Sequence, residues 1–263
     1  MDSKRSLPAS RSSPQGSVEV VERGDIFFLY RPKVETEEAE GLSDVQRFFL
    51  VLRPEGETPM RLMIIGRKHL PDIDTHERVW GFVEEVTDSP EVIQEELGRE
   101  HYPTKTRGER HQPPARPAGE GVYAVVQTGR RLHLAYELEL PDRPGEVQRA
   151  LNIAPQGSFA ISVKNPEQGA PPGVGLGEEK EAHYPRRQQE EFRGRRFATE
   201  DVHLLDIKGA QLVLVGAHKD PEKRFGADLP AEDEALDTAE IFRQLRLKRK
   251  EASIEPLLRG DWR

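Results

Sequence analysis

Two segments of the chain carry the same ordered set of polar residues, His-Tyr-Pro followed by a basic Arg-Gly-x-Arg run. Histidine exchanges protons near neutral pH, and arginine forks bind phosphate or carboxylate through paired hydrogen bonds. The candidate ligand-binding residues are His101, Tyr102, Lys105, Arg107 and Arg110 in the first segment, and His183, Tyr184, Arg193 and Arg196 in the second. We therefore expect an anion-binding site between the two segments. The simpler alternative is a pair of solvated loops whose arginines pair with nearby glutamates.

Other kinds of site find less support in the residue types. The chain has no cysteine, which excludes disulfides, thiolate nucleophiles and metal sites with Cys ligands. The histidines lack the spacing of a metal site, so we expect neither a metal nor another cofactor. Ser158 follows a glycine and is interpreted as a turn residue rather than a nucleophile. The Gly-rich run at 173–177 lacks the spacing of a dinucleotide loop, which favours a flexible linker.

The composition limits the classes of partner. The formal net charge is −8, which argues against general binding to nucleic acids or to anionic membranes. No run approaches the ~18 apolar residues of a membrane span. Residues 1–17 are rich in Ser, Pro and Arg and lack the apolar core of a secretory signal. We expect this segment to be disordered and the protein to be soluble and cytoplasmic, with the Arg, Glu and Pro content typical of a bacterial chain.

The order of motifs predicts an internal duplication. Residues 44–67 and 146–164 each contain an acidic residue, Val-Gln-Arg, an apolar run, Pro-x-Gly and a second apolar run. Pro sets φ at the first turn position and Gly tolerates the conformation that leaves the turn, so each segment is predicted to be a β-hairpin. A further predicted hairpin, 122–136, aligns without gaps on 202–216, and the His-Tyr-Pro segments follow in matching order.

These patterns predict a mainly β (α+β) fold with nine strands in two similar units, 18–130 and 131–218. Residues 131–140 alternate apolar and polar side chains, which is typical of a strand with one wet face. We expect a closed barrel or two stacked sheets, because both hide strand edges. In the barrel, strand 211–217 would return beside strand 25–33.

An alternative interpretation takes 38–47 and 145–151 as helices, and each unit is then a ferredoxin-like module. Short apolar runs leave this open, because a buried strand and a helix look alike there. Residues 79–86 likewise suit a helix or a strand. A helix is predicted to begin after Ser89, with a proline at its first position, and to end near Gly98.

The remaining segments are predicted to be polar. Residues 99–120 and 165–200 are expected to be long loops. The tail, 219–263, is charged and is predicted to contain a helix at 238–251 with a capping box at its start. Its last apolar residues, including Trp262, would dock on the body of the protein or on a partner.

Three functions are compatible with these features. The first is a non-enzymatic binding or assembly protein that takes an anionic small molecule or an acidic protein segment at the His-Tyr-Pro segments. The second is a hydrolase or transferase acting on a phosphorylated small molecule, with His101 or His183 as acid–base. The third is a structural protein that self-associates, or binds a protein partner, through its strands and residues 238–263.

Overall fold

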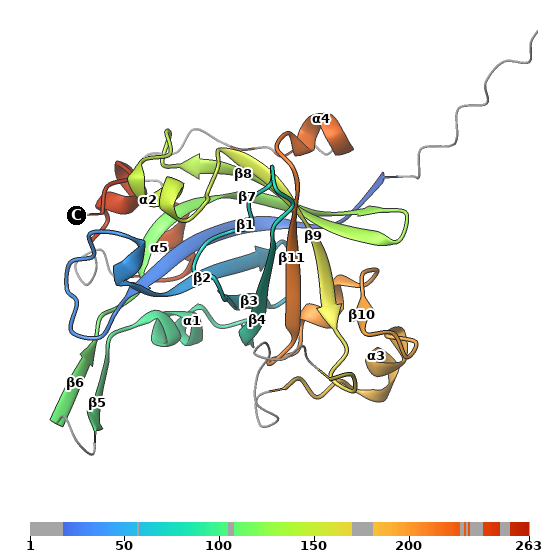
Figure 1. The fold of residues 1–263 in the computed structure, drawn as a ribbon, viewed down its shortest axis with the longest axis horizontal. Coiled ribbons are helices and arrows are strands. Elements are labelled where there is room, and N and C mark those ends of the chain that lie inside the picture. Colours follow the sequence, from blue (N-terminus) through green and yellow to red (C-terminus); the bar gives the residue numbers. More distant parts are fainter. Residues whose placement is uncertain are drawn as a thin grey trace, which may run out of the picture.

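The computed structural model describes residues 18–56, 58–104, 108–169, 181–226, 229, 231, 239–247 and 253–262. In this part of the chain, eight antiparallel strands form a closed barrel and one short strand pairs outside it (Figure 1). The barrel strands are β1 (Val18–Pro32), β2 (Val45–Pro54), β3 (Met60–Ile65), β4 (Arg78–Thr87), β7 (Arg116–Thr128), β8 (Arg131–Leu140), β9 (Gln156–Lys164) and β11 (Gln211–His218). The outside strand is β10 (Phe197–Ala198), which pairs with β9. The predicted mainly β barrel is confirmed.

The barrel closes through β8 and β9. The strand order is β9-β11-β4-β3-β2-β1-β7-β8, and β8 then pairs with β9 from Leu132↔Ile161 to Glu137↔Gln156. The prediction that strand 211–217 lies beside strand 25–33 was therefore wrong, because β11 pairs with β4 and β9. The tandem ferredoxin-like alternative is also replaced by this single closed barrel.

Apolar side chains from all eight barrel strands fill the interior. On β1, Phe28 faces inward and its ring lies 5.3 Å from that of Tyr136 on β8. Its neighbours Phe27 and Leu29 point outward, yet both are fully buried. Because both faces of β1 are covered, its sequence is a continuous apolar run, whereas β8 keeps the alternation that predicted its bounds correctly.

Short helices cover the outside of β1, β2 and β3. They are α1 (Pro90–Leu97), α5 (Glu240–Gln244) and α6 (Glu255–Leu258), which contribute Ile93, Ile241 and Leu257 to this outer apolar cluster. A fourth helix, α4 (Pro221–Phe225), places Phe225 on the outer face of β7 and β8. None of the helices in the described ranges has the length and apolar character needed to cross a membrane.

The two segments that predicted the duplication fold differently. Val45, Gln46 and Arg47 begin strand β2, after the 3-10 helix η1 (Leu42–Asp44). Their counterparts Val147, Gln148 and Arg149 lie in helix α2 (Glu146–Ala150), and only the second half of the predicted hairpin is a strand, β9. Val147 and Leu151 lie one helical turn apart and both fill the end of the barrel, so burial on one face favours the helix. The structure does not show a duplication.

Other predicted elements also changed. The hairpin at 202–216 contains only β11, because its first half is the 3-10 helix η3 (Val202–Leu205). Residues 79–86 belong to strand β4, and α1 follows Ser89 as predicted, although the Ser89 hydroxyl donates to Glu91 instead of capping the helix. The predicted loop 99–120 holds the separate hairpin β5 (Glu100–Thr104) and β6 (Gly108–Gln112), and the start of β7.

The predicted loop 165–200 contains helix α3 (Arg186–Glu191) and strand β10 between irregular stretches. The predicted C-terminal helix is much shorter than 238–251, because α5 ends at Gln244 and residues 245–247 are not helical. Residues 1–17, Thr238 and residues 248–251 lie outside the described ranges, so the predictions for them stay predictions.

Candidate functional site

The second His-Tyr-Pro segment is held on the barrel by an aromatic pair. Tyr184 packs its ring 5.2 Å from that of Phe192, which is fully buried at the end of α3. The Tyr184 hydroxyl donates to the carbonyl oxygen of Leu204 at 2.9 Å, and burial raises the pKa of this phenol. Tyr184 is therefore a neutral anchor for α3, and the exposed His183 beside it stays available to solvent.

A tight turn after α3 presents the basic residues of this segment. Arg193 and Gly194 adopt consecutive positive φ values of 49° and 68°, which reverse the chain and direct it into β10. A pocket of about 630 Å³ lies beside the turn, and we call it the α3 pocket. Its lining includes Tyr184, Gln189, the cations Arg186 and Arg193, and the carboxylates Glu167 and Glu190. Two predicted site residues, Tyr184 and Arg193, thus line one cavity, while Arg196 is exposed nearby in sequence.

Three arginines surround the carboxylate of Glu200 next to this turn. Its carboxylate lies 2.7 Å from Nη2 of Arg130, 3.0 Å from Nη1 of Arg195 and 4.0 Å from Nη2 of Arg193. Hydrogen bonds from Arg130 and Arg195 lower the pKa of Glu200 below its ordinary value, so the carboxylate is charged at neutral pH. Around Glu200 one negative charge faces three positive ones. In the pocket lining itself, Glu190 pairs with Arg186 at 3.1 Å, so the excess of positive charge lies at the Glu200 cluster.

The turn between β7 and β8 supplies Arg130 through tertiary contacts. The Thr199 hydroxyl donates to the carbonyl oxygen of Arg130 at 2.7 Å, and Leu132 N–H donates to the carbonyl of Thr199 at 2.9 Å. Sequence reasoning placed Arg195 in the basic second segment but missed Arg130 and Glu200. No local pattern marks these two residues, because their ion pair requires the residues after β10 to lie beside the β7–β8 turn.

The first His-Tyr-Pro segment forms the β5–β6 hairpin. Its register pairs His101 with His111 and Tyr102 with Arg110. Arg110 lies 3.8 Å from the Glu35 carboxylate. Lys105 and Arg107 lie outside the described residues, as do the side chains of His101 and Tyr102.

The two segments lie on different sides of the molecule. Figure 1 shows the β5–β6 hairpin projecting from one end and α3 on the opposite side of the barrel. The hairpin is held at its base by the buried Arg31, which donates to Glu100 at 2.7 Å and to the carbonyl of Glu96 at 2.5 Å. The described residues of the two segments therefore lie apart, and Tyr184 and Arg193 of the second segment line the α3 pocket.

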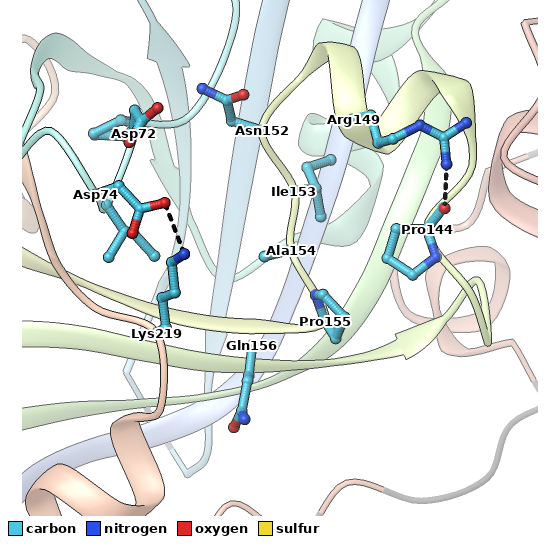
Figure 2. Close-up of a pocket in the computed structure, with 12 residues that line it drawn as sticks. Asp72, Asp74, Pro144, Arg149, Asn152, Ile153, Ala154, Pro155, Gln156 and Lys219 are labelled. Carbon is cyan, nitrogen blue, oxygen red and sulfur yellow. Dashed lines mark hydrogen bonds and ion pairs between the residues drawn. The ribbon is translucent and has the colours of Figure 1, made fainter.

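A second pocket, of about 550 Å³, lies between α2 and the loop that connects β3 to β4 (Figure 2). We call it the α2 pocket. Ile73 and Ile153 contribute to its apolar lining, and charged side chains stand at its rim. Asp74 pairs with Lys219 at 2.7 Å, and the Arg149 guanidinium donates to the carbonyl of Pro144 at 3.0 Å.

Buried hydrogen bonds hold the walls of the α2 pocket. Gln148, which is fully buried in α2, donates to the carbonyls of Ala118 and Pro256 and accepts from Gly145 N–H. The Tyr136 hydroxyl accepts from Ala154 N–H at 3.0 Å and lies 3.1 Å from the carbonyl of the same residue. Because the polar groups of Gln148 and Tyr136 have hydrogen-bond partners inside the protein, the pocket is formed before any ligand binds. Sequence reasoning missed it, because residues 146–164 were predicted to be a β-hairpin, with a helix at 145–151 only as the alternative.

Neither pocket contains a recognisable metal site. No group of three or more His, Asp or Glu within the described ranges is placed to hold a metal ion. No family model, curated protein or solved structure matches the chain. A function can therefore be inferred only from the residues of the two pockets and their surroundings.

Proposed function

We propose that the protein is a cytoplasmic, non-enzymatic binding protein with an anion-preferring site at the α3 pocket. The three arginines around Glu200, of which Arg193 also lines the pocket, carry this proposal, because one carboxylate neutralises only part of their charge. The side chains of Arg130 and Arg193 are 67 % and 59 % exposed, so their guanidinium forks are accessible to a solute. A phosphate- or carboxylate-bearing small molecule fits this chemistry.

The contrast with the rest of the molecule supports this assignment. The chain as a whole carries a net charge of −8, so a local excess of positive charge stands out against an acidic surface and would attract anions to this site. Glu200 holds the arginines in place without filling the neighbouring cavity, and Tyr184 anchors α3 on the barrel. The absence of cysteine is compatible with a cytoplasmic location.

Thermal unfolding in the presence of anions tests the proposal. Inorganic phosphate, sulfate or ATP should raise the melting temperature above that in chloride of equal ionic strength, because a ligand that binds only the native state stabilises it. Arg193→Ala and Arg130→Ala should each weaken binding by about tenfold, since a hydrogen bond to a charged group contributes about 1.5 kcal/mol or more. Arg193→Lys, which keeps the charge but loses the fork, should give an intermediate effect.

Arg259→Ala is the matched control for these variants. Arg259 is exposed and pairs with a single carboxylate, Glu255, at 3.3 Å, away from the α3 pocket. Its removal should leave the anion-induced shift unchanged. A shift that is equal in all variants, or that follows ionic strength alone, would contradict the proposed site.

A further inference from the structure

The α2 pocket has opposite charges on opposite sides of an apolar surface. Figure 2 shows Asp72 and Asp74 on one side, Arg149 and Pro144 on the other, and Ile153 between them. Ile153 is buried, and Ala154 and Pro155 continue the apolar surface toward β9. A ligand in this cavity would therefore meet apolar contacts along its length and charges of opposite sign at its ends.

The acidic side keeps a net negative charge. Asp74 pairs with Lys219, but Asp72 adds a second carboxylate. Its Oδ1 accepts the backbone N–H of Thr75 at 3.0 Å, and this hydrogen bond lowers the pKa of Asp72. Asp72 is thus ionised at neutral pH, and two carboxylates stand against one ammonium group on this side of the cavity.

The basic side keeps a net positive charge. Within the described part of the chain, Arg149 donates to a neutral carbonyl, that of Pro144, and forms no ion pair. The carbonyl uses one N–H of the guanidinium, which has five. The remaining donors can form a two-pronged contact with a carboxylate.

We propose that the α2 pocket binds a short apolar peptide with free termini, its carboxylate on Arg149 and its ammonium group at Asp72 and Asp74. The cavity of about 550 Å³ is of the size that holds small ligands. Because the charged groups stand at opposite sides of it, a ligand must separate its two charges. An extended peptide of about three residues does so, since each residue adds roughly 3.4 Å. This site is separate from the α3 pocket and does not depend on the proposed function.

The walls of the pocket suit a preformed site. On one side, Gln148 fixes α2 through its buried side-chain amide, and Tyr136 fixes Ala154. On the other side, Asp72 N–H donates to the Glu77 carboxylate at 3.0 Å, so neither wall must be ordered on binding. Gln156 adds a side-chain amide at the rim, and Asn152, whose amide nitrogen donates to the carbonyl of Leu70 at 3.0 Å, adds a side-chain oxygen that can accept from a peptide backbone.

Calorimetric titration with defined peptides tests this proposal. Tri-leucine and tri-alanine should bind the full chain, with tri-leucine tighter because it buries more apolar surface. The C-terminal amide and the N-acetylated form of tri-leucine should each bind about tenfold more weakly, because each loses one charge-assisted contact. Free leucine should bind more weakly than tri-leucine, since it cannot reach both charged sides.

Three variants assign the contacts to residues. Arg149→Gln should abolish the preference for the free carboxylate, and Asp72→Asn should reduce the preference for the free ammonium group while its amide oxygen still accepts from Thr75. Ala154→Phe should fill the cavity and abolish binding, although the backbone contacts of Ala154 with Tyr136 remain possible. Arg143→Gln is the control, because this exposed arginine does not line the pocket.

The outcomes are decisive in both directions. Loss of end-group preference in Arg149→Gln and its retention in Arg143→Gln, with unchanged melting temperatures, would establish the site. No heat with any of the peptides, or binding in which neither terminus matters, would overturn the proposal. Anion binding at the α3 pocket would be unaffected by either result.

Discussion

At the scale of single residues, His133 is the side chain whose burial has the clearest consequence. It lies on β8 on the outer face of the barrel, with its ring 5.0 Å from Phe225 and 6.2 Å from His218. Burial, aided by repulsion from His218, Arg131 and Arg224, lowers the pKa of His133 to about 4 from an ordinary value of 6.5. Burial and Arg224 also lower the pKa of His218.

Acid should therefore destabilise the protein through these histidines. Between pH 6.5 and about 4 the unfolded chain binds a proton at His133 that the native state does not, so the free energy of unfolding falls as the pH falls. His133 is half-buried, and we expect it to account for about 1–3 kcal/mol of that loss. Urea unfolding at several pH values should give a flatter profile for His133→Leu than for the natural chain. Equal slopes in the two proteins would contradict the assignment.

At the scale of elements, the C-terminal segment covers one end of the barrel interior. Helix α6 packs on β7, and Trp262 lies with its ring 5.3 Å from that of Tyr30 at the end of the interior cluster. Gly260 has a φ of +71° and lies close to Gly145. A Cβ added to Gly260 would be 2.5 Å from the Cα of Gly145, so only glycine fits at position 260. Residues 253–262 thus use their apolar side chains within their own chain, which leaves less of this segment for assembly with a partner.

Removing the tryptophan tests this role. Trp262→Ala should lower the free energy of unfolding by about 3–5 kcal/mol, because it empties a packed site against Tyr30. Asp261→Ala, which alters an exposed neighbour, should change stability by less than about 0.5 kcal/mol. Chemical denaturation measures both values. An equally small effect of both variants would mean that the C-terminal segment does not pack on the end of the barrel in solution.

At the scale of the whole molecule, a buried ion network seals the other end of the barrel. Arg61 is fully buried and donates to both carboxylate oxygens of Glu22, at 2.6 and 2.8 Å, and to Asp206 at 2.6 Å. The Tyr123 hydroxyl donates to Glu22 at 2.8 Å. These residues come from β1, β3, β7 and the segment after η3, so the network joins strands that are distant in sequence.

Substitutions that break this network should lower the free energy of unfolding strongly, and the losses of the single variants should not be additive. Arg61→Met leaves Glu22 and Asp206 near the interior without their cation, and we expect a loss of about 3–5 kcal/mol. In the double variant Arg61→Met with Glu22→Gln, one orphaned charge is removed, so the total should be smaller than the sum of the single losses. Denaturant unfolding of all three variants forms the cycle. Strictly additive losses would show that the contacts are not coupled.

Parts of this architecture could be predicted because the information is local. The alternation of residues 131–140 predicted both bounds of β8, and the Ser-Pro pair predicted the start of α1. The abundance of apolar β runs and turn residues predicted a closed antiparallel fold. The predicted duplication did not predict the local structure, because Val-Gln-Arg begins a strand at Val45 and lies within a helix at Val147.

The candidate sites could be predicted only in part. Tyr184 and Arg193 were identified from their residue types, and they do line one pocket. Arg130 and Glu200 were missed, because their ion pair requires β10 to lie beside a distant turn. The separation of the two His-Tyr-Pro segments could not be predicted either, since it follows from the path of the chain around the barrel.

The sequence by itself determined the class of fold, the bounds of its most regular strands and the exclusion of cysteine chemistry, because these depend on residue type and short-range periodicity. Only the tertiary structure decided which strands close the barrel, that residues 146–150 are helical, and which charges face one another. The physical reason is that pairing, burial and ion contacts form between segments far apart in the chain, where many arrangements satisfy the same local pattern. The packing of the whole chain selects one of them.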